Sequence, residues 1–166
     1  MRLAVLLLAA AIGPELDVQL APAPARLSVQ FEVRGDLPAE WREALEAGAP
    51  VEITYRVRVY RNRRWLWDHR LASHELMVKA QRDPLTGSFT VVSELDEEIL
   101  ASGQAASTDE AIRWVTHPPV AEIQVPLRHE PLWLVTRAEF LNRFKLLVIP
   151  STVGTDWVTL AVPGSP

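Results

Sequence analysis

The segment VEITYRVRVY, residues 51–60, alternates apolar and polar side chains along its whole length. A period of two is typical of a β-strand that has one face in the core and one in water. Each buried aliphatic side chain stabilises the fold by about 1.5–3 kcal/mol, so slipping the strand by one residue would be costly. The segment therefore predicts a β-sheet with a fixed register. The residues predicted to face the core are Val51, Ile53, Tyr55, Val57 and Val59.

Other segments with strand-like composition extend this prediction along the chain. The stretch RDPLTGSF contains Pro84 and Gly87, which favour a turn between two antiparallel strands. The remaining strands are expected at residues 15–20, 25–35, 71–82, 88–95, 120–125, 131–136, 143–150 and 156–163.

Two short helices are expected between these strands. Asp36 stands where an N-cap would precede the first helix, Trp41 and Leu45 share one helical face, and Gly48 marks the end. Ser107 and Glu110 form a capping box at the start of the second helix. The acidic segment SELDEEILASGQAA, residues 93–106, is interpreted as a loop. The fold class predicted is α+β, mostly antiparallel β, as a sandwich-like meander with two short helices.

The N-terminal segment MRLAVLLLAAAIG has one cation, a short apolar run and small residues at Ala9 and Ala11. This order is typical of a secretory signal peptide, and the run is too short for a membrane-spanning helix, which needs about 20 apolar residues. The alternative is a buried first strand or helix. We expect a signal peptide at residues 1–13, a single β-rich domain at residues 14–166, and an extracytoplasmic (periplasmic or secreted) location.

Composition excludes several classes of protein. The chain of 166 residues has no cysteine, which rules out disulfides, thiolate metal sites and a cysteine nucleophile. The net charge of −4 does not favour nucleic acid as a partner.

Residues that could carry catalysis are not arranged in a recognisable pattern. The histidines have no metal-ligand spacing, and the sequence contains no Gly-rich phosphate loop or nucleophile elbow. The acidic segment shows no pair of carboxylates held in different environments. We therefore expect a protein that is not an enzyme and that needs no metal or cofactor. The histidines are His69, His74, His117 and His129.

The stretch YRNRRWLWDHRLASHE, residues 60–75, is rich in arginine and tryptophan. These residue types dominate binding hot spots, and they also suit contact with anionic lipid headgroups. The alternative is structural: the tryptophans close the core while the arginines keep a hairpin edge soluble. The candidate interaction surface comprises Arg56, Arg58, Arg61, Arg63, Arg64, Trp65 and Trp67.

The order of several of these segments resembles a bacterial family known as domain of unknown function 4390. The residues that carry the resemblance are Gly48 to Val51 at the entry to the long strand, Arg63 to Trp67 in the hairpin, and Leu85-Thr86 in the turn. It extends over roughly residues 16–162. The resemblance implies a protein that bears a signal peptide, and it supplies no catalytic residues.

The function expected from the sequence is a non-enzymatic protein-interaction module of the bacterial envelope, whose partner is another envelope or membrane protein. Peripheral contact with the membrane is compatible with the same surface. The alternative function is binding or sensing of a small apolar or anionic ligand between the sheets.

Overall fold

The predicted central strand is the middle of a seven-stranded antiparallel sheet, which has the order β10-β8-β3-β4-β5-β6, with β9 paired to β8. The computed structural model describes residues 13–23, 26–61, 69–125, 131–140 and 153–162. The uninterrupted meander runs only from β3 to β6, because β8 returns from later in the chain to pair with the free side of β3. The strands of this sheet are β3 (Val51–Arg61), β4 (His69–Arg82), β5 (Phe89–Leu95), β6 (Glu98–Ala105), β8 (Leu132–Phe140), β9 (Val153–Gly154) and β10 (Val158–Ala161).

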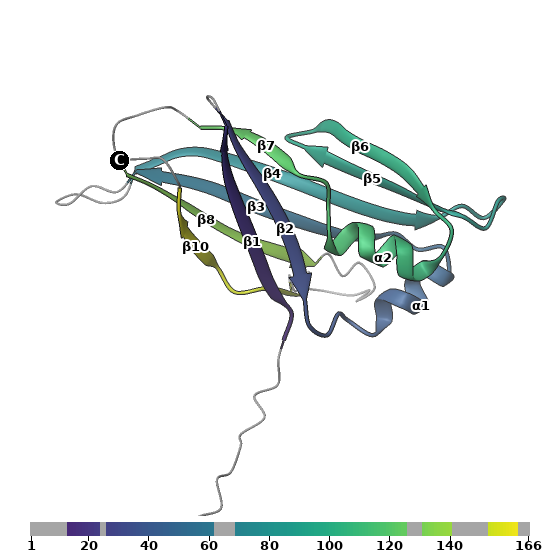
Figure 1. The fold of residues 1–166 in the computed structure, drawn as a ribbon. Coiled ribbons are helices and arrows are strands. Elements are labelled where there is room, and N and C mark those ends of the chain that lie inside the picture. The colour runs from purple at the N-terminus through teal and green to yellow at the C-terminus, as the bar shows by residue number, and fades with distance from the viewer. Residues whose placement is uncertain (1–12, 24–25, 62–68, 126–130, 141–152, 163–166) are drawn as a thin grey trace, which may run out of the picture.

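A second sheet crosses one face of the first, as Figure 1 shows for β1 and β2. It has three antiparallel strands in the order β1-β2-β7. The two sheets meet where Phe31 stacks on Tyr55, with 4.9 Å between the ring centroids. These strands are β1 (Glu15–Ala23), β2 (Arg26–Arg34) and β7 (Ala121–Gln124).

Both helices pack on the same face of the seven-stranded sheet as the small sheet does. Trp41 of α1 (Glu40–Glu46) meets Phe140 of β8 edge to face. The Tyr55 hydroxyl donates a hydrogen bond of 2.7 Å to the carbonyl of Val115 in α2 (Thr108–Thr116). The core-facing residues predicted for β3 are all buried here. The predicted α+β fold with antiparallel sheets is therefore confirmed.

The helix ends confirm most of the sequence-based prediction. Ser107 accepts from the Glu110 amide, and the Glu110 carboxylate accepts from the Ala106 amide, as a capping box requires. Gly48 adopts a φ of +83° just beyond α1, which only glycine adopts without strain. The prediction for Asp36 was wrong: α1 begins later, and its N-cap, Ala39, makes no side-chain capping bond.

The interpretation of residues 93–106 as a loop was also wrong. They contain the end of β5, a two-residue turn and the edge strand β6. Asp96 and Glu97 have φ values of 51° and 72°, which is the left-handed conformation of a type I′ hairpin turn. Glycine normally occupies such a turn, so its absence here concealed the hairpin.

The opposite face of the seven-stranded sheet is covered by no helix or strand among the described residues. The described helices are all too short or too polar to cross a membrane. The predicted signal peptide at residues 1–13 lies almost wholly outside the described residues, and so does the strand predicted at residues 143–150.

Candidate interaction surface

The uncovered face of the seven-stranded sheet carries charged and aromatic side chains from neighbouring strands. In β3 the residues between the buried ones point to this face, including Arg56 and Arg58. In β8 the same alternation brings Arg137 and Glu139 to it, and Arg56 lies directly opposite Arg137 in the register. The face is polar because its strands alternate and only their other side meets the core.

A buried carboxylate holds two of these arginines. Glu139 is 7% exposed, and it accepts a 2.7 Å hydrogen bond from Arg56 Nε and another of 2.7 Å from Arg137 Nε. Burial by itself raises the pKa of Glu139, but the hydrogen bonds and positive charges of Arg137 and Arg56 outweigh it, so the pKa lies below its usual value. The hydrogen bond to Glu139 likewise raises the pKa of Arg56. This network fixes both guanidinium groups over the sheet.

Trp157, immediately before β10, completes the group. The guanidinium carbon of Arg58 lies 4.7 Å from its ring centroid, and that of Arg137 lies 4.9 Å away. These are cation–π distances, and Trp157 still remains 40% exposed. We call Arg58, Arg137 and Trp157 the arginine–tryptophan clamp.

The clamp differs in part from the surface predicted from the sequence. Arg56 and Arg58 lie on the outward face, as predicted. Arg61 is only 9% exposed, because it follows Val57 and Val59 on the core-facing side of β3, and it is thus a poor contact residue. The other members of the predicted surface, Arg63, Arg64, Trp65 and Trp67, lie outside the described residues.

Sequence reasoning missed Arg137, Glu139 and Trp157 as parts of this surface. Arg137 and Glu139 are two residues apart in a strand pattern, which places them on one face and could have marked them as a pair. Their meeting with Arg56 depends on the pairing of β3 with β8, which are separated in the chain by β4, β5, β6, α2 and β7.

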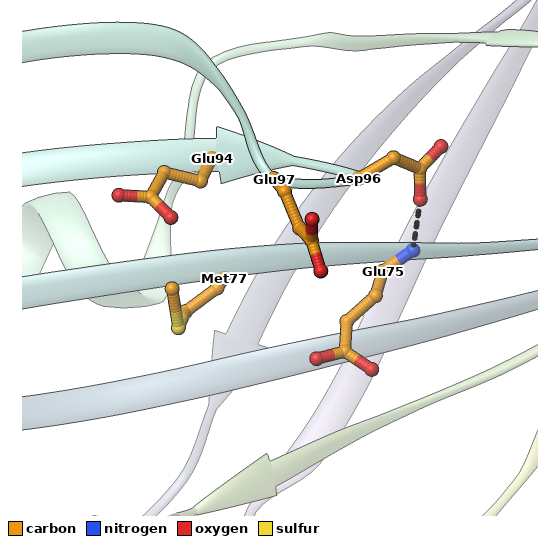
Figure 2. Close-up of a pocket in the computed structure, with 5 residues that line it drawn as sticks. All are labelled: Glu75, Met77, Glu94, Asp96 and Glu97. Atoms are coloured by element: carbon orange, nitrogen blue, oxygen red, sulfur yellow. Dashed lines mark hydrogen bonds between the residues drawn. The ribbon is translucent and has the colours of Figure 1, made fainter.

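An acidic groove lies beside the clamp on the same face, and Figure 2 shows its lining. It has a volume of about 330 Å³. The side chains of Glu75, Met77, Glu94 and Glu97 project from one side of β4, β5 and the turn between β5 and β6, whereas the Asp96 carboxylate turns away. Asp96 instead accepts a 2.9 Å hydrogen bond from the Glu75 amide. The lining residues are Glu75, Met77, Glu94, Asp96 and Glu97.

A neutral pair separates the clamp from the acidic groove. Arg56 and Glu75 are directly opposite each other in β3 and β4, with 3.8 Å between Arg56 Nη1 and Glu75 Oε2. Beyond this pair, Glu94 and Glu97 have no salt-bridge partner within the described part of the chain. Arg58 likewise has no salt-bridge partner among these residues, and it contacts the Trp157 ring instead. The face therefore carries the unpaired positive charge of Arg58 on one side of the Arg56–Glu75 pair and the unpaired negative charges of Glu94 and Glu97 on the other.

The histidines do not converge. His74 bonds Asp96 through Nδ1 at 2.6 Å and approaches the Gln124 carbonyl through Nε2 at 3.3 Å. His117 lies 3.4 Å from Glu32, and His69 begins β4. His129 lies outside the described residues, within which no group of histidine and carboxylate ligands could hold a metal ion. Each of these contacts joins a histidine to no more than one carboxylate.

Comparison with known proteins places the chain in one family. No curated protein and no solved structure matches it. Residues 16–131 match the family described as domain of unknown function (DUF4390), which covers most of the chain and both sheets as far as β7. The match ends before β8, so it leaves out Arg137, Glu139 and Trp157. The chain belongs to the DUF4390 family.

Proposed function

We propose that this chain is a non-enzymatic protein-interaction module of the bacterial envelope, and that it binds another envelope protein through the arginine–tryptophan clamp. One observation carries the proposal: a partly exposed tryptophan makes cation–π contacts with two guanidinium groups on the uncovered face of the sheet. No role in the core requires this arrangement, because the core lies on the other side of the same strands.

The chemistry of the clamp favours an acidic partner segment. The contact with the Trp157 ring restricts where the Arg58 guanidinium lies. Such a guanidinium can receive a carboxylate through two parallel hydrogen bonds while losing little further side-chain entropy. The indole of Trp157 adds apolar area at the centre of the contact, as aromatic residues do in binding hot spots.

The extracytoplasmic location belongs to the same proposal. Its support is the order of the N-terminal residues, with Arg2 followed by the apolar run from Leu3 and by small residues at Ala9 and Ala11. A fusion of residues 1–20 to a reporter that is active only outside the cytoplasm would test it. An inactive fusion would contradict this part of the proposal.

The alternative function, binding or sensing of a small apolar or anionic ligand between the sheets, receives less support. The facing sides of the sheets are filled by side chains such as Phe31 and Tyr55. Two of the described pockets are lined by residues at the surface, for example Arg113, Trp114 and His117 beside the end of α2. A third is lined by residues of both sheets, and its lining is mostly polar although it includes the buried Ile123.

The experiment is affinity capture from an envelope extract with the wild-type chain as bait. Arg58→Ser and Trp157→Ala are the test variants. Their matched controls are Arg113→Ser, which removes an exposed arginine of α2, and Leu85→Ala, which removes a side chain that is 94% exposed in a distant turn.

We expect a partner that the wild type and both controls retain and that both test variants lose. Retention by all five proteins would contradict the clamp as the binding site. Anionic and zwitterionic vesicles form a second arm, because binding to anionic vesicles alone would indicate a membrane surface as the partner.

A further inference from the structure

We propose that the uncovered face pairs with the same face of a second copy of this chain, so that the clamp of each copy enters the acidic groove of the other. This inference rests on the proposed function and names a partner for the same surface. The clamp and the groove lie side by side on one face, separated by the Arg56–Glu75 pair.

The clamp and the groove match in chemistry. The groove is lined by one apolar side chain, Met77, together with carboxylates that include Glu94 and Glu97. A methionine sulfur makes favourable contacts with an aromatic ring, so Met77 would suit the indole of Trp157. The two carboxylates lack salt-bridge partners among the described residues, and they would receive the similarly unpaired Arg58 of the other copy.

The arrangement also satisfies the symmetry of a dimer. In a twofold dimer the same patch of each copy forms the interface. If residue A of the first copy contacts residue B of the second, then residue B of the first also contacts residue A of the second, so each patch must contain both residues. Here the cationic half lies over β3 and β8, the acidic half lies over β4 and β5, and the neutral pair lies between them. An axis through the Arg56–Glu75 pair would place each clamp over the opposite groove. If the second copy were turned the other way, its clamp would face the first clamp and its groove would face the first groove, so like charges would oppose each other.

The dimer would compete with an envelope partner for the clamp. An acidic segment of such a partner would displace the groove of the second copy, because both offer carboxylates to Arg58. The proposed function and the dimer are therefore tested by separate measurements.

The test is sedimentation equilibrium of the full chain purified from the envelope of an expression host, together with two charge-reversal variants. Arg58→Glu reverses the clamp, and the double variant Glu94→Arg/Glu97→Arg reverses the groove. Each variant alone would oppose like charges twice in the dimer. A one-to-one mixture would restore attraction at both contacts: one would have the native charges and the other would have the charges exchanged.

We expect the wild type to dimerise reversibly, each variant to associate at least about tenfold more weakly, and the mixture to regain dimers. Added salt should weaken the wild-type dimer. Thermal unfolding of both variants should match the wild type, because these side chains lie outside the core.

A wild type that stays monomeric over its whole soluble range would overturn the dimer, and so would a dimer that survives both reversals. Failure of the mixture to associate would overturn the twofold pairing of clamp and groove. None of these results decides whether an envelope partner is captured, so the proposed function stands or falls on its own experiment.

Discussion

The two faces of β3 differ in both burial and chemistry. On the inward face, Tyr55 is fully buried, stacks on Phe31 and donates its hydroxyl to the carbonyl of Val115. On the outward face, one residue further along, Arg56 binds Glu139 and contacts Glu75 across the strand pair. Adjacent residues of one strand therefore serve different purposes.

This difference separates the side chains that stabilise the fold from the side chains that are available to bind a partner. Inward side chains stabilise the fold by leaving water, whereas exposed ion pairs contribute little, about 0–1 kcal/mol each. Substitutions on the outward face can thus change binding while the fold persists. The exception is Glu139, which is buried although its strand position faces outward.

The largest expected effect comes from the inward face. Phe31→Ala should lower the free energy of unfolding by about 3–5 kcal/mol, because it removes a fully buried ring and leaves a cavity beside Tyr55. Met77→Ala on the outward face is the control, and it should cost less than about 1.5 kcal/mol. Equilibrium denaturation by urea measures both. Similar losses for the two variants would contradict the separation of the faces.

The next largest effect is expected at Glu139, the buried carboxylate on the outward face. Glu139→Gln should cost about 1.5–3 kcal/mol at neutral pH, because hydrogen bonds to a charged group are lost. The pKa of Glu139 is lowered in the folded state, so its contribution is present above its ordinary value of 4.5 and is lost as the pH falls toward the lowered pKa. The variant should therefore lose less stability than the wild type on acidification.

Thermal unfolding between neutral and acidic pH measures this effect. Glu98→Gln is its control, because that carboxylate is exposed at the start of the edge strand β6. If Glu139→Gln and the wild type lost stability in parallel below pH 4.5, the ascribed role of the Glu139 charge would be wrong.

A smaller effect of opposite sign is expected at Thr136. Its side chain is fully buried in β8, and its hydroxyl has no hydrogen-bond partner within the described ranges. Thr136→Val keeps the shape and removes the unsatisfied group, so it should raise the free energy of unfolding by about 1 kcal/mol. Denaturant titration measures the gain. A loss of stability would show that the hydroxyl is satisfied in solution.

The smallest effect on stability is expected at the clamp. Trp157→Ala removes two cation–π contacts of a ring that is 40% exposed, and both guanidinium groups regain water when the ring is removed, so the loss of stability should be well below about 1 kcal/mol. The melting temperature should therefore change little while self-association is weakened strongly. Both are measured on one preparation by calorimetry and sedimentation. A large drop in the melting temperature would show that Trp157 is needed for the stability of the fold.

The local parts of the fold could be read from the sequence where a strong periodic signal was present. The alternation of residues 51–60 predicted β3 and its inward face, and Ser107 with Glu110 predicted the start of α2. The β5–β6 hairpin was missed because Asp96 and Glu97 adopt a turn conformation that normally requires glycine. The Asp96 carboxylate accepts hydrogen bonds from His74 and from the Glu75 amide, and these bonds support the turn from β4, which is distant from it in the chain.

The sequence by itself determined the fold class, the family and the presence of arginine and tryptophan on a strand surface. Periodicity and caps are local, so neighbouring residues suffice to specify them. Only the tertiary structure decided that Arg61 is buried and that Arg58 and Arg137 both contact the ring of Trp157. The clamp depends on β8 and β10 returning to the free side of β3, and pairing between distant strands is chosen by the packing of the whole sheet.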